Sequence, residues 1–498
     1  MNFEEWAKLT EELSTMTPTE KANRVMNIDF GNDFSLVFNT WAKTYDNVGV
    51  GVAGLAKRLS ETMGFDLESF ERMYEMEGGL AEWFDAYGDN EHESDVSIKD
   101  AFACLYAESV EEAYELYFDV FVNLSSMGRK WLTAYMVKKT RNGIGESEVK
   151  KMLVKQKGVK AAEIKRAACF LNISEIITQL SINGVAGDCQ LMYSPTIGKF
   201  MTPMLAKGGD FTVDRQCLVD YKYDGIRAQF HISPNKELTV FNRKGDDITD
   251  KFLDIGGDLL EVCDDKGWIL DGEIYPINED GSPAEFKLMM SRIHGKDKSK
   301  IYRNAVTASI FDVLYYDGQS VFDWTYRLRN VLLSKIGKFA AKQTTISTKE
   351  EMMDFYHEAI ADGYEGVIVK SLTSAYEFGK RSKAWMKYKP PMIDVDCLVT
   401  GASFGAGKRA GKLGSFEIAI TDGTELIPMG CVGSGFTVDD LSMMTRLYNN
   451  HGPNKLIIEV KGDMVTQNER GEYGLRFPRF VKYRDDKVEP TNIKELNL

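Results

Sequence analysis

The sequence predicts a multidomain protein built from three parts of different fold class: an all-α N-terminal part, a mixed α+β middle part and a small C-terminal β-barrel. Three observations predict this order. The chain has 498 residues, about three times the length of an average domain. The spacing of apolar residues changes from a helical to a strand period after about residue 200, and stretches rich in Gly and Pro separate the parts.

The N-terminal part is predicted to be helical up to about Ile182. Residues 110–121 place apolar side chains at three- and four-residue spacing, which is typical of an amphipathic helix. Prolines, which interrupt helices, are nearly absent before residue 200. The composition then turns to Gly, Ser, Pro and Thr over residues 184–203, which indicates a linker. We therefore expect a helical domain over residues 1–200.

The middle part is predicted to mix strands and helices. Between Cys217 and Lys389, short β-branched and aromatic runs alternate with helical stretches. Two consecutive prolines at 390–391 then break the chain. Beyond them, strand-like runs and Gly-rich turns follow one another at the spacing of a β-barrel of about a hundred residues. We expect a middle domain over residues 201–389 and a barrel over residues 390–498.

The distribution of charge is more informative than the formal net charge of −14, because a nucleic acid senses the charge of a face and not the total. Residues 1–120 hold 8 Lys+Arg against 26 Asp+Glu, whereas residues 121–200 hold 13 against 5. The other 298 residues hold 40 against 44 and are close to neutral. A short basic segment inside an acidic protein is the first indication of a nucleic-acid partner.

The basic segment is predicted to contain a helix whose apolar face lies within residues 131–136 and whose cations lie largely elsewhere. A run of charge is often only a solvated face, but two helices joined by the Gly-x-Gly turn at 143–145 favour binding to the DNA backbone. The Gly-rich loop over residues 401–412 could likewise be an ordinary hairpin or a second grip on the backbone. The candidate DNA-binding residues are Arg129, Lys130, Lys138, Lys139, Arg141, Lys160, Lys165, Lys408, Arg409 and Lys412.

The cysteines and the N-terminus indicate where the protein works. The seven cysteines are scattered and form no Cys-x-x-Cys pair, so a reducing compartment is the simplest interpretation. No basic segment with an apolar core begins the chain, and no window approaches the ~18 apolar residues of a membrane span. We expect a soluble intracellular protein without a membrane partner, located in the cytoplasm or wherever its DNA resides.

Lys222 is the candidate nucleophile. It lies at the end of a predicted strand, beside an Asp-Gly turn, where a lysine is usually just an exposed strand end. It becomes a nucleophile only as the free amine, which neighbouring cations or desolvation favour. Further along, Trp385, Lys387 and Lys389 fall on one face of a predicted strand, because side chains alternate along a strand. Two ammonium groups about 7 Å apart suit a phosphate clamp better than a core.

Two carboxylates accompany these lysines. Glu273 ends the string Leu-Asp-Gly-Glu, and Glu365 begins the string Glu-Gly-Val-Ile-Val-Lys. Carboxylates of this kind suit a Mg²⁺ ion that is shared with substrate phosphates. Each short string taken singly could be merely structural, so the order of the strings along the chain carries more weight.

That order is Lys-x-Asp-Gly-x-Arg at 222–227, Asn-Arg-Lys-Gly at 242–245, Asp-Gly-Glu at 271–273, Phe-Asp-Val-Leu-Tyr at 311–315, Glu-Gly-Val-Ile-Val-Lys at 365–370, Trp-Met-Lys-Tyr-Lys at 385–389, and Arg-Phe-Pro-Arg-Phe-Val-Lys-Tyr-Arg-Asp-Asp-Lys at 476–487. It resembles the ATP-dependent DNA ligases, specifically the three-domain type of eukaryotes, archaea and large DNA viruses. The resemblance runs from the basic segment to the C-terminus. The helical first 200 residues, Met-Thr-Pro-Met-Leu-Ala-Lys at 201–207 and the Arg-Phe-Pro-Arg string point to DNA ligases among related nucleotidyltransferases.

The resemblance implies a DNA-binding domain, an adenylation domain and an OB-fold domain, with ATP as a substrate and Mg²⁺ as a cofactor. It implies that Lys222 becomes adenylylated and that Phe311 stacks on adenine. It further implies contacts of Arg227 and Arg243 with the ribose and phosphates, of Glu273 with the ribose or metal, of Glu365 with the metal, of Lys370, Lys387 and Lys389 with the α-phosphate, and of Arg479, Arg484 and Lys487 with the β- and γ-phosphates.

Asp220 departs from the family pattern. The family usually has Glu two residues before the lysine, where it reads the adenine amino group, and Asp is one methylene shorter. The adenine contact and strict selectivity for ATP are therefore open. The implied reaction seals nicks with a 5′-phosphate and a 3′-hydroxyl in double-stranded DNA, through a lysyl-AMP and a DNA-adenylate intermediate, and the implied form is a monomer that encircles the duplex.

Three alternatives remain at this point. An RNA ligase or a capping-type nucleotidyltransferase would use the same lysine chemistry, although the long helical N-terminal part weighs against both. An NAD-dependent DNA ligase is disfavoured because the four-cysteine zinc site of that family has no counterpart here. A catalytically silent DNA-end-binding scaffold would have no need for Lys222, Glu365, Lys387 and Lys389 together.

Overall fold

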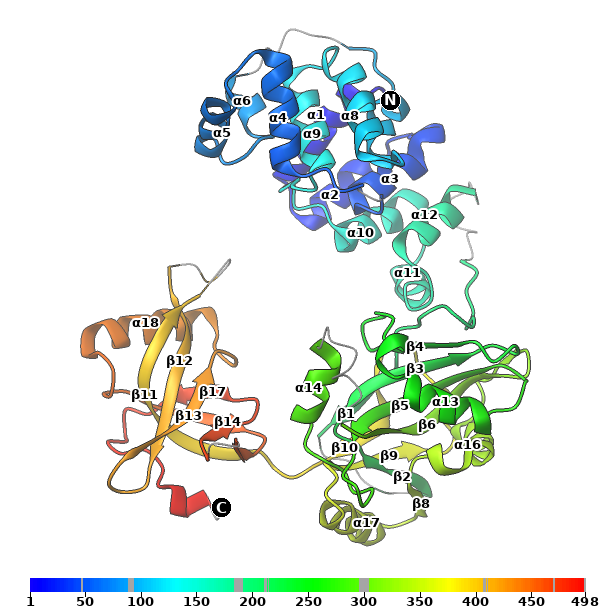
Figure 1. Cartoon of the computed structure of the whole chain (residues 1–498), viewed down its shortest axis with the longest axis vertical. Helices are drawn as coiled ribbons and strands as arrows, with labels where there is room; N and C mark the ends of the chain where they lie inside the picture. The colour runs from blue at the N-terminus through cyan, green and yellow to red at the C-terminus, as the bar shows by residue number, and fades with distance from the viewer. Residues whose placement is uncertain are drawn as a thin grey trace. The chain divides into compact units, whose positions relative to one another are not determined.

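The computed structural model describes residues 1–45, 48–87, 94–182, 191–209, 213, 215–294, 304–405, 409, 411–468 and 471–496. Up to residue 182 the elements of the described residues are helices, strands and helices alternate in the middle, and strands dominate the C-terminal region (Figure 1). The predicted fold class is therefore confirmed. None of the helices in the described ranges combines the length and the apolar character needed to cross a lipid bilayer.

The N-terminal helices share one apolar core that includes Trp6 and Trp41. Glu4 is almost fully buried, and its carboxylate accepts hydrogen bonds from the backbone N–H of Ser125 (2.7 Å) and from its hydroxyl. An acidic side chain of the first helix thus holds the start of helix α9. The bounds of the helices are α1 Phe3–Ser14, α2 Pro18–Val25, α3 Phe34–Ala42, α4 Val52–Met63, α5 Leu67–Met76, α6 Trp83–Tyr87, α7 Ile98–Phe102, α8 Val110–Phe121, α9 Ser126–Met136, α10 Glu146–Lys157, α11 Ala161–Ala167 and α12 Ile173–Ile182.

Helix α9 has the apolar face that its sequence predicts. Trp131, Leu132, Tyr135 and Met136 are all buried. The loop that follows is ordered by Asn142, whose side-chain amide donates to the Tyr135 hydroxyl (2.8 Å). This hydrogen bond fixes the loop that follows α9 on the apolar core.

The middle region contains two five-stranded sheets. The first has the order β1-β10-β9-β2-β8 and the second the order β4-β3-β5-β6-β7. The apolar core of the second sheet includes Leu259 of α13 and Leu333 of α16. The bounds are β1 Leu205–Gly208, β2 Cys217–Lys222, β3 Ile226–Ile232, β4 Leu238–Asn242, β5 Trp268–Pro276, β6 Val306–Tyr316, β7 Gln319–Ser320, β8 Gln343–Ile346, β9 Gly366–Ser371, β10 Arg381–Tyr388, α13 Leu253–Val262, α14 Lys287–His294, α16 Tyr326–Leu333 and α17 Lys349–Ala361.

The chain crosses from the first sheet to the second immediately after Lys222, where β2 ends and β3 begins three residues later. This crossing packs tightly on β5, because a Cβ atom on Gly225 would lie 2.1 Å from the carbonyl oxygen of Ile274. Gly272 in β5 is equally confined, since its Cβ would lie 2.7 Å from the carbonyl oxygen of Ser309. The glycines of two motifs thus permit a close backbone approach, and the first lies at the crossing that follows Lys222.

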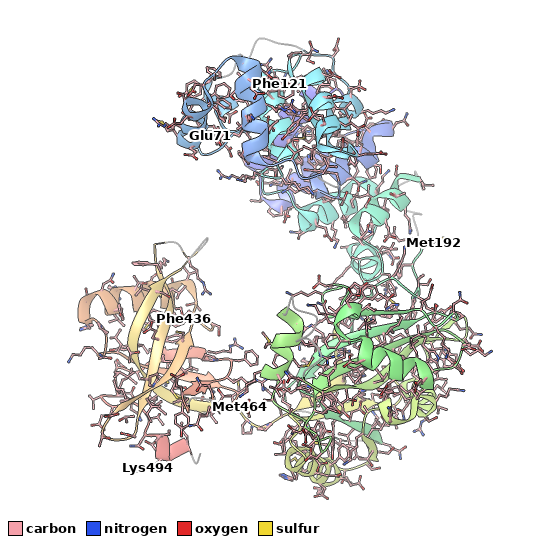
Figure 2. All side chains as sticks on the ribbon, in the orientation of Figure 1. Glu71, Phe121, Met192, Phe436, Met464 and Lys494 are labelled. Carbon is pink, nitrogen blue, oxygen red and sulfur yellow. The ribbon has the colours of Figure 1, made fainter. Side chains whose placement is uncertain are left out.

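The C-terminal region is built on a five-stranded antiparallel sheet of order β13-β12-β11-β14-β17, with a hairpin β15-β16 and the helix α18. Its apolar core includes Phe416 and Phe480, and Phe436 stacks on Phe480 with ring centroids 4.2 Å apart. Figure 2 labels Phe436 in this region. The bounds are β11 Ile393–Phe404, β12 Leu413–Thr421, β13 Leu426–Val432, α18 Val438–His451, β14 Ile457–Gly462, β15 Val465–Gln467, β16 Tyr473–Leu475 and β17 Arg479–Tyr483.

Candidate active site

Asp220 and Lys222 lie on the same side of β2, because side chains alternate along a strand. Lys222 is half-buried at the strand end, whereas Asp220 is only 1% exposed. The Asp220 carboxylate pairs with the ammonium group of Lys370, which lies on the neighbouring strand β9 and is also 1% exposed. Burial raises the pKa of Asp220 to about 6 and lowers the pKa of Lys370, and each partner opposes the other's shift.

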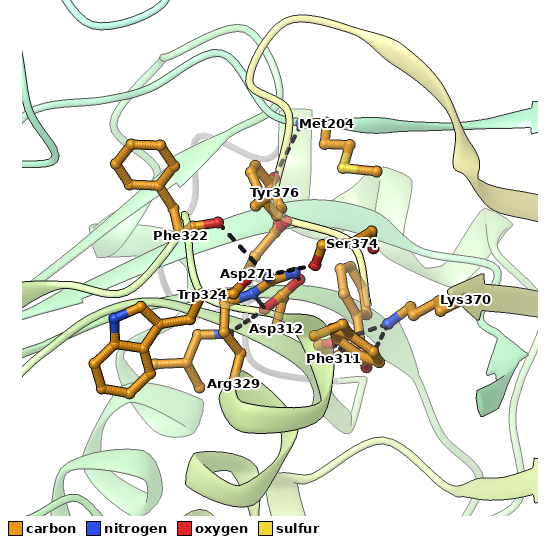
Figure 3. A network of polar contacts seen from close by, with 12 residues as sticks. Met204, Asp271, Phe311, Asp312, Phe322, Trp324, Arg329, Lys370, Ser374 and Tyr376 are labelled. Atoms are coloured by element: carbon orange, nitrogen blue, oxygen red, sulfur yellow. Dashed lines mark hydrogen bonds and ion pairs between the residues drawn. The ribbon is translucent and has the colours of Figure 1, made fainter. Parts of the chain in front are cut away.

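Phe311, on β6, lies beside this ion pair and is 9% exposed. Its carbonyl oxygen accepts hydrogen bonds from Lys370 Nζ (2.9 Å) and from the hydroxyl of Tyr326 (2.9 Å). Its ring centroid lies 4.5 Å from the guanidinium carbon of Arg227 and 4.9 Å from Lys370 Nζ. The aromatic ring expected to stack on the base is therefore fixed by a backbone clamp and flanked by two cations. Figure 3 shows one of them, Lys370, beside Phe311.

Arg227 is held by a buried carboxylate one strand away. Its guanidinium makes two parallel hydrogen bonds of 2.6 Å to Asp271 of β5 and donates to the carbonyl oxygen of Met204 (3.2 Å). The hydroxyl of Tyr376 donates to the same carboxylate (2.5 Å). Glu273 lies directly opposite Arg227 in the antiparallel register of β3 and β5, so the two side chains share a face of the sheet. These strands thus bring a cation and two carboxylates together.

A third buried carboxylate, Asp312, follows Phe311 in the chain. Arg329 of α16 pairs with it through bonds of 2.7 and 2.9 Å, and neither side chain is exposed. Arg329 also donates to the carbonyl oxygen of Ser374 (3.1 Å), which ties α16 to the segment after β9 (Figure 3). A bidentate, fully desolvated pair of this kind fixes the position of both backbones. The backbone at Phe311 is therefore held at its own carbonyl oxygen and through the side chain of the next residue, Asp312.

Three of these residues, Tyr326, Arg329 and Tyr376, lie outside the motifs of the sequence. Asp271 and Asp312 lie inside two of the motifs, but no local pattern assigns a role to either. Tyr376 lies 105 residues from its partner Asp271, and Arg329 lies 17 residues from Asp312. An aromatic or charged residue at such a separation gives no periodic signal, so only the folded chain reveals these contacts.

Arg243 lies apart from this buried network, in the exposed turn after β4. The turn is held by Asn242, whose side-chain oxygen accepts from the backbone N–H of Lys244 (2.8 Å) and of Asp246 (3.1 Å). This arrangement is an Asx-type turn, which fixes the backbone without using the arginine. The Arg243 guanidinium is thus presented on a rigid turn.

Glu365, Lys387 and Lys389 lie around the ends of β9 and β10. Glu365 immediately precedes β9, and Lys387 lies within β10. Strand β10 ends at Tyr388, so Lys389 lies one residue beyond the strand on which its side-chain direction was predicted. Lys389 Nζ is 2.7 Å from the carboxylate of Asp463.

The cations predicted to reach the β- and γ-phosphates differ in their surroundings. Arg484 makes ion pairs with Asp396 (2.8 Å), Glu459 (3.3 Å) and Asp486 (2.8 Å), all within the C-terminal region. Lys487 lies 3.2 Å from Asp396 and is exposed, and Arg479 is exposed at the start of β17. Arg484 therefore organises its own domain, whereas Arg479 and Lys487 are more accessible to a ligand.

The predicted metal ligands Glu273 and Glu365 could hold Mg²⁺ only together with further ligands from a bound nucleotide. Over the described ranges, no three Asp, Glu, His or Cys side chains lie close enough to hold a metal ion by themselves. Mg²⁺ is usually bound by one or two carboxylates together with phosphate oxygens and waters. Glu273 and Glu365 could contribute such ligands, with substrate phosphates supplying the rest.

Arg129 and Lys130, two of the predicted DNA-binding cations, make several contacts each within the helical region. Arg129 donates to the carbonyl oxygens of Phe121 (3.0 Å) and Val122 (3.1 Å), which caps the C-terminus of α8. Lys130 is only 14% exposed and pairs with Glu11 (2.7 Å) and Asp85 (2.6 Å). These contacts give both side chains a structural role.

The other predicted cations of the helical region are more accessible. Lys138 donates to the carbonyl oxygen of Tyr45 (3.0 Å), and Arg141 donates to that of Gly78 (2.9 Å) while remaining exposed. Three lysines are exposed and have no ion-pair partner within the part of the chain that the structure describes. They are Lys139, Lys160 and Lys165.

The Gly-rich loop over residues 401–412 contains three of the predicted DNA-binding residues. Arg409 donates to the carbonyl oxygen of Gly433 (2.9 Å), and Lys412 donates to the hydroxyl of Ser442 (2.7 Å). Lys408 lies outside the described residues. The two described cations therefore make contacts to the body of their own domain.

Comparison with protein families gives two matches. The model of the ATP-dependent DNA ligase domain matches residues 203–389, and the model of the ATP-dependent DNA ligase C-terminal region matches residues 409–487. Among curated proteins, the chain is 32% identical over 395 residues to a DNA ligase of Methanosphaerula palustris, covering 74% of this chain and 69% of that protein. It is 25% identical over 504 residues to DNA ligase 2 of Methanosarcina mazei, covering 91% and 88% of the two chains.

Among solved structures, Pmar-Lig_PreS3 is similar with a TM-score of 0.56 and 17% sequence identity, and the match covers 96% of this chain and 99% of that one. At this identity the likeness concerns the fold alone. It includes the N-terminal helices, to which neither family match extends.

The buried Asp312–Arg329 pair generates a stability prediction. Replacing Arg329 by Met leaves an uncompensated buried carboxylate, which we expect to cost about 3–5 kcal/mol of unfolding free energy. Urea unfolding measures this loss. The double variant Arg329→Met/Asp312→Leu removes both charges, so it should recover most of the stability.

The exposed pair Arg58–Glu111 provides the control, because Arg58→Met should change the unfolding free energy by less than about 1 kcal/mol. A double Arg329→Met/Asp312→Leu variant no more stable than Arg329→Met would contradict the buried-charge explanation.

Proposed function

The chain belongs to the family of ATP-dependent DNA ligases, and on this premise we propose that it seals nicks in duplex DNA by joining a 5′-phosphate to a 3′-hydroxyl. The observation that carries the proposal is the place of Lys222. This lysine ends β2 at the crossing between two sheets, two residues from a buried carboxylate and within the region that matches the ligase domain. It is the nucleophile in the reaction that we propose.

We propose that the protein has three domains with different tasks. Residues 1–200 bind the duplex, residues 201–389 carry out adenylation, and residues 390–498 form the OB-fold domain. The end of helix α12 at Ile182 and the start of strand β1 at Leu205 support the first boundary. The start of β11 at Ile393 supports the second. The protein would act as a monomer that surrounds the nick.

In the first transfer, the free amine of Lys222 attacks the α-phosphorus of ATP, and pyrophosphate leaves. Lys387 and Lys389 neutralise charge on the transferring phosphoryl group, which is the main catalytic contribution in such displacements. Phe311 stacks on the base, with Asp220 beside it, and Arg227 and Arg243 bind the ribose and phosphates. Mg²⁺, held by Glu365 and Glu273 together with phosphate oxygens, would supply further charge neutralisation when bound.

In the second transfer, AMP passes from Lys222 to the 5′-phosphate of the nick. In the third, the adjacent 3′-hydroxyl attacks that phosphate, and AMP is released. Arg479 and Lys487 assist only the first transfer, by contacting the β- and γ-phosphates, so the C-terminal domain must change its position between steps. The internal ion pairs of Arg484 support a role for it in holding that domain together.

The lysyl-AMP intermediate can be tested directly. We expect the protein to retain radioactive label after incubation with α-labelled ATP and Mg²⁺, because the P–N bond is covalent. Lys222→Ala should abolish this label, which denaturing electrophoresis would detect. The exposed Lys266 serves as the control, and Lys266→Ala should still become labelled. Label on Lys222→Ala would show that another residue is the nucleophile.

Binding of the helical region to DNA gives a second prediction. Reversing the charge of Lys139, Lys160 and Lys165 to Glu should weaken binding to nicked DNA, because each loses a phosphate contact. Each lost contact should also reduce the slope of log affinity against log salt by about 0.9. Fluorescence anisotropy over a salt series measures both quantities.

A matched control separates a local contact from the change in total charge. Lys8, Lys57 and Lys99 are exposed in the acidic part of the helical region, so their reversal to Glu changes the net charge equally. We expect a smaller loss of affinity and little change in the salt slope. Equal effects in the two triple variants would argue against a specific DNA-binding surface.

A further inference from the structure

Lys21, in helix α2, is a buried lysine that contacts the loop between α9 and α10, residues 137–145. It is only 3% exposed, and within the part of the chain that the structure describes it forms no ion pair. Its ammonium group donates to the carbonyl oxygens of Asn142 (2.9 Å) and Gly143 (3.0 Å). Burial lowers the pKa of Lys21, and the charge of Glu148 opposes this shift. Because a lysine usually keeps its ammonium group in water, Lys21 holds the α9–α10 loop at a cost in solvation.

The α9–α10 loop has an unusual backbone. Lys138 (φ 53°), Arg141 (φ 40°) and Gly143 (φ 60°) all lie in the left-handed region, in which residues other than glycine are strained. Such strain persists only where the surrounding structure enforces the conformation. The hydrogen bonds from Lys21 supply one constraint, and the hydrogen bond between the Asn142 side chain and α9 supplies another. The loop is thus held from two different helices.

Lys21 also orients one peptide group of this loop. The bond between Asn142 and Gly143 is trans, so its carbonyl and its N–H point in opposite directions. The carbonyl of Asn142 is directed at Lys21, and the N–H of Gly143 is therefore directed away from it. Gly143 is exposed, and its N–H has no hydrogen-bond partner among the described residues. The loop thus presents an unsatisfied backbone donor close in sequence to the exposed cations Lys139 and Arg141.

We propose that Lys21 is a positioning residue for DNA binding, which holds the α9–α10 loop so that the N–H of Gly143 meets a phosphate of the duplex. Backbone N–H groups commonly contact phosphates of the DNA backbone, and loops with left-handed residues form concave sites for anions. Lys21 is itself buried and makes no contact with the phosphate. This inference rests on the proposed function, because it concerns how the helical region holds the duplex.

Three possible roles of this lysine predict different results. A lysine that contacts a phosphate directly releases a counterion, so its loss reduces the slope of log affinity against log salt by about 0.9. A neutral N–H group releases none, so the loss of a positioning residue lowers the affinity and leaves the slope nearly unchanged. A purely structural lysine contributes to the free energy of unfolding alone, and its loss leaves the affinity of the folded protein unchanged.

The decisive variant is Lys21→Met, which keeps the length of the side chain and removes the ammonium group. Fluorescence anisotropy with a nicked duplex over a salt series measures its affinity and salt slope, at a temperature where circular dichroism shows a folded protein. We expect the affinity to fall about tenfold, the value of one hydrogen bond to a charged group, with little change in slope. Labelling of the protein by α-labelled ATP should be unchanged, because that reaction belongs to another domain.

Lys236→Met is the matched control. Lys236 likewise donates to two backbone carbonyl oxygens, those of Leu260 (3.1 Å) and Cys263, but it lies in the middle region. Its replacement removes the same charge and the same kind of hydrogen bonds as Lys21→Met. We expect it to leave the affinity for nicked DNA unchanged. An equal loss of affinity in the two variants would overturn the positioning role.

A second variant, Gly143→Ala, changes the loop and leaves every charge in place. The left-handed φ of Gly143 is unfavourable for alanine, and the added Cβ would lie 3.1 Å from Lys21 Nζ. We expect a similar loss of affinity, and the double variant Lys21→Met/Gly143→Ala should lose little more than either single variant, because both act through one loop. If Lys21→Met does not fold, Gly143→Ala decides alone.

The outcomes separate this inference from the proposed function. Unchanged affinity in folded Lys21→Met or in Gly143→Ala overturns the positioning role, as does a fall of about 0.9 in the salt slope of Lys21→Met, which would indicate a direct contact. In each of these cases the wild-type protein still binds and seals the nick. If the wild-type protein does not bind nicked DNA, the proposed function fails and this inference fails with it.

Discussion

The structure of the middle region depends on neutralising three carboxylates that water cannot reach. An isolated charge in such a place is strongly unfavourable, and each carboxylate is matched by one cation. Two of these cations belong to the motifs at 222–227 and 365–370, and the third braces the residue after Phe311. The pairs are Asp220–Lys370, Asp271–Arg227 and Asp312–Arg329. The strands that carry the proposed chemistry are therefore aligned by charge pairing as much as by apolar packing.

This constraint explains why several motif residues have two tasks. Arg227 flanks Phe311 and also satisfies Asp271, while Lys370 satisfies Asp220 and also clamps the backbone of β6. A resemblance to a family assigns such residues to a ligand because they accompany the ligand-binding motifs. Counting donors and acceptors in the folded chain distinguishes those that can still reach a ligand from those already occupied.

Much of the fold could be predicted from the sequence, because it follows from local periodicity. The change of period after residue 200, the apolar face of α9 and the start of α10 at Glu146 each come from a short window of residues. The pairing of cations could not be predicted in this way. Lys130 and its partner Glu11 are 119 residues apart, so a local pattern cannot show whether a basic side chain is solvated or already paired. Part of the acidic excess before residue 120 is thus structural.

The central claim is that the chain joins DNA strands through an adenylylated lysine, and the most direct measurement is sealing of a nick. A duplex with one 5′-phosphorylated nick would be incubated with the protein, Mg²⁺ and either ATP, GTP, NAD or no nucleotide, beside the Lys222→Ala variant. We predict a sealed strand with ATP and the wild-type protein, and none with NAD, without nucleotide or with Lys222→Ala. Sealing that is independent of Lys222, or sealing of a nicked RNA in preference to DNA, would contradict the account.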